Sequence, residues 1–219
     1  MIKRYAAAAL AAAVAIAAAW WAVTGRGAKS TGPDALQSAG AGYQGFIGGV
    51  LEPPRAAPDF TLVDQHGSAY TLSEQRGDIV VLFFGYTTCP DVCPTTLVQY
   101  RRIKGLLGDD AARVQFVFVT VDPERDTRER LGEYLSHFDS EFVGLTGESE
   151  ALQAVWRAYG VYVERVDAPN SQVGYWVNHS SVSYVIDTKG DLRLIHLYNT
   201  PSEDVVHDLA LLLAEAKAA

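Results

Sequence analysis

The chain has 219 residues, 48% of them hydrophobic, and a formal net charge of −8 at pH 7. This length allows one domain of ordinary size plus an appendage, and the acidic balance excludes the overall basic surface that nucleic-acid binding requires. Two cysteines are too few for a disulfide-stapled secreted scaffold, so a pair only four positions apart indicates a site.

Residues 1–26 have the pattern of an N-terminal membrane anchor. Lys3 and Arg4 precede an uninterrupted apolar run over residues 6–23, which at 1.5 Å per residue spans about 27 Å, enough to cross a hydrocarbon core. Positive charges before the run favour a cytoplasmic N-terminus, which places the rest of the chain on the extracytoplasmic, periplasmic side. A cleaved signal peptide is the alternative, although its apolar region is usually shorter. We expect an uncleaved transmembrane helix.

Residues 27–52 are expected to form a flexible linker. They are rich in glycine, alanine and serine, a composition typical of flexible tethers. Pro53, Pro54 and Pro58 then mark the start of the folded part. We therefore predict a single domain over residues 53–219.

The domain is predicted to alternate strands with helices. Residues 79–84 form a continuous apolar run, as in a strand buried on both faces, and residues 114–121 form a second, largely apolar run that indicates another central strand. The other predicted strands form two hairpins, 60–63 with 69–72 and 181–186 with 192–197. Helices are expected over residues 95–107, 126–138, 148–159 and from 201 onward. This order predicts an α/β fold, with a central mixed sheet flanked by helices and an antiparallel hairpin at its end.

Cys89 and Cys93 lie in the loop that follows the apolar strand 79–84. In open α/β sheets, sites form at the carboxyl ends of strands, and the following helix N-terminus favours thiolate over thiol. At this spacing the two Cα atoms can lie about 6 Å apart, close enough for a disulfide or for two sulfurs to bind one ion. Thiolates are soft donors that suit Cu(I) best, with zinc as the common competitor.

A third ligand would have to come from elsewhere, and the chain has five histidines. His179 stands just before the predicted strand 181–186, and in this topology that connection can return beside the cysteine loop. Spacing alone does not distinguish whether His179 is a ligand or an ordinary polar residue. The others lack neighbouring ligands at a binding spacing and are expected to be structural: His66, His137, His196 and His207.

Three acidic residues lie close together at Asp122, Glu124 and Asp126. Paired carboxylates can serve as general acid and base, which is one interpretation. The other is structural: Pro123 turns the chain and Asp126 caps the next helix. We favour the structural interpretation.

Several motifs together resemble the Sco/SenC family, copper-handling proteins of cytochrome c oxidase assembly. The resemblance runs from Gly45 to the last helix and rests on residues 46–49 (FIGG), 57–60 (APDF), 84–94 (FGYTTCPDVCP), 121–127 (VDPERDT) and 179–181 (HSS). It implies a thioredoxin-like fold, an N-terminal membrane helix and a mononuclear copper site. The implied ligands are the sulfurs of Cys89 and Cys93 and a ring nitrogen of His179. Many members carry aspartate before this histidine; here Asn178 supplies no charge, which puts electrostatic tuning from that position in doubt.

The resemblance implies a copper chaperone that delivers copper to the CuA centre of cytochrome c oxidase subunit II. Subunit II and other copper carriers are then the expected partners. The first alternative is a membrane-anchored thiol–disulfide oxidoreductase that reduces cysteines of a copper-site partner, with Cys89 and Cys93 as its redox pair. Three residues between these cysteines, rather than two, distinguish the motif from the common CxxC. A redox or copper sensor is the second alternative. We expect a non-enzymatic metallochaperone, with thiol–disulfide reductase activity left open.

Overall fold

The computed structural model describes residues 45–218. The predicted membrane anchor and most of the predicted linker lie outside these residues. Within the described part, no helix is both long enough and apolar enough to cross a membrane.

The folded part begins before the predicted boundary at residues 52 and 53. That boundary falls inside strand β1, Gly49–Ala56, and Phe46 is already buried. β1 is an edge strand that pairs antiparallel with β10, and its register shifts between Val50 and Arg55. Proline is tolerated at an edge because no N–H is needed there for a further strand. Pro53 and Pro54, predicted to mark the start of the folded part, are therefore part of the sheet, whereas Pro58 follows β1.

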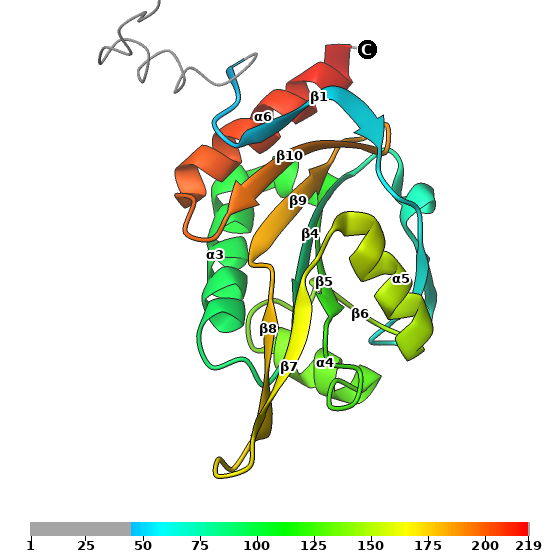
Figure 1. The fold of residues 1–219 in the computed structure, drawn as a ribbon. Coiled ribbons are helices and arrows are strands. Elements are labelled where there is room, and N and C mark those ends of the chain that lie inside the picture. The colour runs from blue at the N-terminus through cyan, green and yellow to red at the C-terminus, as the bar shows by residue number, and fades with distance from the viewer. Residues whose placement is uncertain (1–44, 219) are drawn as a thin grey trace, which may run out of the picture. The chain divides into compact units, whose positions relative to one another are not determined.

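An eight-stranded mixed sheet forms the centre of the domain (Figure 1). Its order is β1-β10-β9-β4-β5-β6-β2-β3. The parallel pair β4 and β5 lies in the middle, and every residue of β4 is buried, as the continuous apolar runs predicted. Both predicted hairpins are confirmed as β2–β3 and β9–β10. The strands not yet bounded are β2 Thr61–Asp64, β3 Ala69–Thr71, β4 Ile79–Gly85, β5 Val114–Thr120, β6 Val143–Thr146, β9 Val182–Ile186 and β10 Asp191–Leu197.

Helices cover both faces of the sheet. Side chains alternate along β4, so Phe83 packs against Tyr100 of α3 on one face while Phe84 packs against Tyr159 of α5 on the other. α4 and α6 lie on the α3 side, where Tyr134 of α4 meets Phe118. The helices are α3 Val92–Leu107, α4 Arg128–Ser136, α5 Ser149–Tyr159 and α6 Ser202–Ala218, with short 3-10 turns at Leu72–Gln75 and Gly108–Arg113. The expected α/β architecture is confirmed.

A two-stranded antiparallel ribbon, which the sequence analysis did not predict, connects α5 to β9. It consists of β7, Val163–Ala168, and β8, Gly174–His179, and it forms a sheet of its own. Figure 1 shows it extending past the end of the central sheet. β7 is mostly exposed and carries three charged residues, a pattern that resembles a loop more than a half-buried strand. Because β8 ends at His179, the ribbon brings this residue to the site.

Candidate metal centre

Cys89, Cys93 and His179 meet at the carboxyl end of β4. Cys89 is half-buried in the β4–α3 loop, Cys93 is fully buried in the first turn of α3, and His179 is the last residue of β8. One ligand atom from each lies within 4.8 Å of the other two. Cys93 Sγ lies 3.5 Å from His179 Nε2. The connection before β9 thus returns beside the cysteine loop, as the topology allowed.

Gly85, the last residue of β4, makes room for the buried thiol. A Cβ atom at this position would lie 2.9 Å from Cys93 Sγ and 2.8 Å from the rings of Phe83 and Phe118. The loop then turns so that the Cys89 N–H donates to the Tyr86 carbonyl at 3.2 Å, and the Cys93 N–H donates to Cys89 Sγ at 3.5 Å. The first turn of α3 therefore directs a backbone donor at one of the two sulfurs.

The two thiols differ in electrostatics. A hydrogen bond from the Cys93 thiol, supported by His179 and by the backbone amides of Asp91 and Cys93, lowers the pKa of Cys89 to about 4 despite partial burial. Burial, followed by the neighbouring Cys89 sulfur, raises the pKa of Cys93. The metal-free site therefore holds one thiolate and one thiol at neutral pH, and a metal that binds both sulfurs displaces the Cys93 proton.

His179 is held in one tautomer and one orientation. Its Nδ1 lies 2.9 Å from the Ser180 carbonyl oxygen, which can only accept, so the ring proton sits on Nδ1. Nε2 then faces the cysteines. The ring makes edge contacts with Phe83 and Tyr86, with centroids 6.1 Å and 5.8 Å away. An imidazole oriented in this way beside two sulfurs offers three donors that could hold a soft metal ion.

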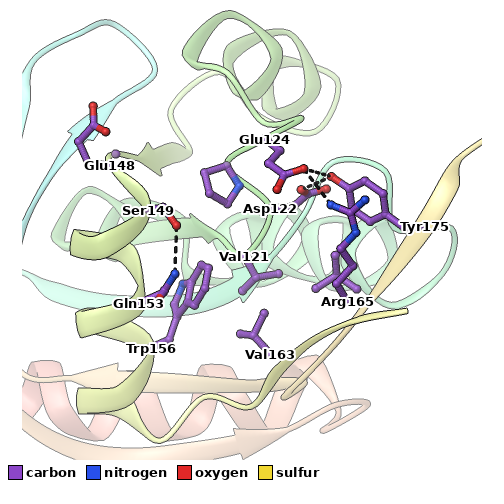
Figure 2. Close-up of a pocket in the computed structure, with 13 residues that line it drawn as sticks. Val121, Asp122, Glu124, Glu148, Ser149, Gln153, Trp156, Val163, Arg165 and Tyr175 are labelled. Atoms are coloured by element: carbon purple, nitrogen blue, oxygen red, sulfur yellow. Dashed lines mark hydrogen bonds and ion pairs between the residues drawn. The ribbon is translucent and has the colours of Figure 1, made fainter. Parts of the chain in front are cut away.

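A cavity of about 500 Å³ borders the ribbon away from the three ligands (Figure 2). It lies between α5, the loop after β5 and the inner side of β7 and β8. Trp156 and Val163 contribute apolar surface, and Glu124, Arg165 and Tyr175 contribute polar groups. None of its lining residues is a cysteine or a histidine, so it is separate from the candidate metal centre.

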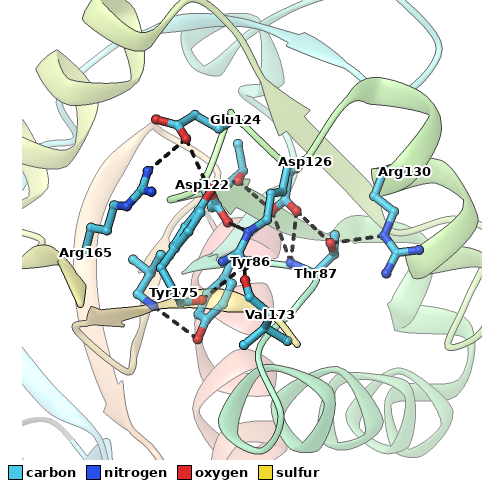
Figure 3. Close-up of polar contacts among 12 residues, drawn as sticks. Tyr86, Thr87, Asp122, Glu124, Asp126, Arg130, Arg165, Val173 and Tyr175 are labelled. Atoms are coloured by element: carbon cyan, nitrogen blue, oxygen red, sulfur yellow. Dashed lines mark hydrogen bonds and ion pairs between the residues drawn. The ribbon is translucent and has the colours of Figure 1, made fainter. Parts of the chain in front are cut away.

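Asp126 does not cap the next helix, contrary to the prediction. Its buried carboxylate accepts the N–H and the hydroxyl of Thr87 and the hydroxyl of Thr120, the two hydroxyls at 2.6 Å and 2.7 Å (Figure 3). Burial raises its pKa. The cap of α4 is Thr127, which accepts the Arg130 N–H. Aspartate and threonine are both good caps, so sequence alone could not choose between neighbours. Asp126 instead fixes the start of the cysteine loop.

The other two acids of this cluster are engaged in ion pairs. Buried Asp122 pairs with Arg125 and accepts the Tyr175 hydroxyl at 2.7 Å, and Glu124 pairs with Arg165 at 2.9 Å. Figure 3 shows Asp122, Glu124 and Arg165 gathered around Tyr175, near the start of β8. All three acids of the cluster thus make structural contacts, although the helix cap predicted for Asp126 is not one of them. Arg125 and Tyr175, which sequence reasoning did not single out, join the cluster to β8.

Asn178 takes part in the ribbon. Its side-chain amide donates to Glu164, its register partner on β7, at 3.3 Å. An aspartate at this position would place a like charge opposite Glu164, which is unfavourable in a cross-strand pair. Asn178 is therefore compatible with Glu164 on the opposite strand, because it can donate a hydrogen bond and carries no charge.

The remaining histidines lie in other parts of the structure. His196 is buried and donates from Nε2 to Asp208 at 2.8 Å, a pair that the sequence did not suggest. His207 donates to the Gly45 carbonyl, and His137 is the C-cap residue of α4. His66 lies in the β2–β3 turn. None of the four belongs to the group at the cysteine loop.

Comparisons with known proteins identify a family and several relatives of this chain. The SCO1/SenC family model matches residues 49–214. The SCO2-like protein of Rickettsia felis is 38% identical over 146 residues, 66% of this chain and 71% of that protein. A putative copper-binding protein of Stutzerimonas stutzeri is 39% identical over 145 residues, 66% of this chain and 70% of that protein.

Two solved structures with copper bound share the fold. ScoI of Bradyrhizobium japonicum is 34% identical with a TM-score of 0.66, over 72% of this chain and 99% of that one. Yeast Sco1 is 29% identical with a TM-score of 0.64, over 76% of this chain and 91% of that one. These similarities confirm the thioredoxin-like fold that the sequence resemblance implied.

Proposed function

The chain belongs to the SCO1/SenC family, and from this premise we propose that it binds one Cu(I) ion through Cys89, Cys93 and His179 and passes it to another protein. The observation that carries the proposal is the convergence of two sulfurs and an oriented imidazole within 4.8 Å. This donor set suits Cu(I). Related structures from Bradyrhizobium japonicum and yeast are described with copper bound.

The geometry suits transfer better than storage. Two thiolates and Cu(I) carry a formal charge of −1, which a neutral imidazole does not change. A closed structural site uses four ligands, whereas three leave a position open. Since Cys89 is half-buried, a ligand of an acceptor can approach from that side and replace the three donors one at a time. Return of a proton to Cys93 then favours release.

We propose that the acceptor is the CuA centre of cytochrome c oxidase subunit II, and that other copper carriers supply the ion. Residues 1–26 would anchor the chain and residues after them would tether the domain on the periplasmic side. Support comes from the family resemblance and from relatives described as a Bacillus anthracis lipoprotein and a mitochondrial SCO2 homologue of Danio rerio. BsSco, 21% identical, shares the fold and is described as a member of a family of cytochrome c oxidase assembly proteins.

A thiol–disulfide oxidoreductase is the second candidate, favoured by the asymmetry of the thiols. The Cys89 thiolate, half-exposed and with its pKa lowered to about 4, would attack a partner disulfide and form a mixed disulfide. Cys93 would then lose its proton and attack Cys89. The partner would leave with two thiols and the chain would hold a Cys89–Cys93 disulfide, so two electrons pass to the partner.

A Cu(I) titration of the reduced full chain in detergent, against a chromophoric chelator, tests the chaperone. The parent and the exposed-histidine control His207→Ala should each bind one copper per chain. Cys89→Ala and His179→Ala should bind much more weakly. Full affinity in His179→Ala would remove the histidine from the ligand set. Failure of the parent to bind, with both thiols free, would leave the oxidoreductase as the better reading.

A further inference from the structure

The strand that carries His179 is held by few elements. β7 and β8 pair only with each other, and an isolated two-stranded hairpin is marginally stable in water. On the inner side of the ribbon, Val163 and Arg165 of β7 border the cavity of about 500 Å³ (Figure 2), so the packed contacts come from β8, whose Tyr175 and Val177 are buried. The position of the last residue of β8 therefore depends on a small number of contacts that β8 makes with the domain.

Arg125 ties β8 to the loop after β5. Its Nη1 donates to the carbonyls of Val173 and Tyr175, both at 3.1 Å. Its guanidinium lies 3.7 Å from the centroid of the Tyr175 ring and pairs with buried Asp122, which in turn accepts the Tyr175 hydroxyl. One side chain thus holds the backbone at the start of β8, the Tyr175 ring and, through Asp122, the Tyr175 hydroxyl.

Arg125 also lies near Tyr86, a residue that contacts both the cysteine loop and His179. Its guanidinium lies 5.7 Å from the Tyr86 ring centroid. Tyr86 meets the edge of the His179 ring, accepts the Val177 N–H at its hydroxyl at 3.4 Å, and accepts the Cys89 N–H at its carbonyl. Tyr86 therefore contacts both the cysteine loop and His179, and the Arg125 guanidinium lies over the Tyr86 ring.

We propose that Arg125 is a positioning residue of the metal centre, which holds His179 at ligand distance from the two sulfurs without touching the metal. This inference rests on the proposed function, since it assumes that the three residues bind the ion. Lysine cannot replace the arginine, because a single ammonium lacks the planar fork that reaches two carbonyls while stacking on a ring.

The test compares Cu(I) affinity of the reduced full chain with that of Arg125→Lys, His179→Ala and the double variant. Arg125→Lys should weaken binding about 10-fold, as outer partners of metal ligands typically do. In the double variant it should add little to the loss from His179→Ala, because both changes act through the same ligand. The reduction potential of the Cys89–Cys93 pair should stay close to the parent value, since the sulfurs are not displaced.

Arg193→Lys is the matched control. Arg193 is also largely buried, pairs with Asp187 and Glu215, and faces the Phe46 ring, but it lies in β10 away from the centre. It should leave Cu(I) affinity unchanged. Parent-like affinity in Arg125→Lys, or full additivity with His179→Ala, would overturn the inference, whereas a parent that binds no copper would instead overturn the proposed function.

A second variant covers the case in which Arg125→Lys fails to fold. Tyr175→Leu keeps the arginine and removes the ring on which it stacks. It should weaken Cu(I) binding in the same direction by a smaller factor, and it should speed amide exchange in β8. Unchanged affinity together with unchanged exchange would contradict the positioning role.

Discussion

Cys89 and Cys93 stand four residues apart in one loop, yet their surroundings give them different chemistry. Cys89 is half-buried and receives hydrogen bonds from the Cys93 thiol and from backbone amides, which stabilise its thiolate. Cys93 is enclosed below it, where burial favours the neutral thiol. This division assigns the first contact with an incoming metal or partner to Cys89 and the later, proton-releasing contact to Cys93.

Alkylation with iodoacetamide should reveal this division in the reduced, metal-free chain. Because the pKa of Cys89 is lowered to about 4, Cys89 should be labelled at pH 6, where an ordinary thiol is almost fully protonated. Cys93 should remain unlabelled in the folded protein. Mass spectrometry of peptides gives the rate at each site. Equal rates for the two cysteines, or labelling of Cys89 only above pH 8, would contradict the assignment.

Asp126 and Thr127 are neighbours with separable roles. Asp126→Ala should lower the free energy of unfolding by about 3 kcal/mol, because it strands the buried donors of Thr87 and Thr120. Thr127→Ala should cost only about 1 kcal/mol, the usual value of a helix cap. Urea unfolding of both variants measures the difference. A larger loss in Thr127→Ala than in Asp126→Ala would reverse the two assignments.

At the scale of the element, the sequence predicts strands that are buried on both faces, but it does not predict a strand that forms only through contacts with other parts of the fold. β4 is entirely apolar and β5 is largely so, and both could therefore be found without a structure. β7 could not, because its exposed, charged segment is a strand only through its pairing with β8. The two cysteines were therefore identifiable from their motif, while His179 needed the family resemblance.

Amide hydrogen exchange should show the ribbon to be the more easily opened element and the one that copper stabilises. In the metal-free chain, amides of β8 should exchange faster than those of β4, which is fully buried in the sheet. Cu(I) should slow exchange in β8, because the metal would join His179 to the cysteine loop. The β9–β10 hairpin provides the internal reference. Equal protection of β8 with and without copper would contradict this coupling.

At the scale of the whole domain, a buried histidine–aspartate pair joins the first described residues to the last helix. Asp208 of α6 accepts the N–H groups of Ile47 and Gly48, both at 2.8 Å, and the Nε2–H of His196. A Cβ at position 48 would lie 2.6 Å from the His196 ring, so only glycine allows this approach. The FIGG stretch is thereby explained as the segment that fastens the start of the domain.

The Asp208 pair should make stability depend on pH. Burial would raise the pKa of Asp208, but hydrogen bonds from His196 and from the amides of Ile47 and Gly48 hold it below its usual value. Its contribution is therefore present above the unfolded-state pKa of about 3.9 and is lost as the pH falls through the lower folded-state value. Asp208→Asn should cost about 2 kcal/mol at pH 7.

Urea unfolding at a series of pH values measures this effect. The stability gap between the parent and Asp208→Asn should narrow as the pH falls below about 4, because the carboxyl becomes neutral in both folded and unfolded parent chains. Asp204→Asn, at a partly exposed position in the first turn of the same helix, is the control and should show little change. A gap that stays constant down to pH 2 would show that the ionised carboxylate is not the stabilising form.

The central claim is a Cu(I) site of two sulfurs and one imidazole nitrogen, and X-ray absorption at the copper edge tests it most directly. The full chain loaded with one Cu(I) should show two sulfur neighbours and one nitrogen neighbour with the outer-shell pattern of an imidazole. His179→Ala should keep the sulfurs and lose the nitrogen. A sulfur-only environment in the parent, or an unchanged imidazole signal in His179→Ala, would contradict the account.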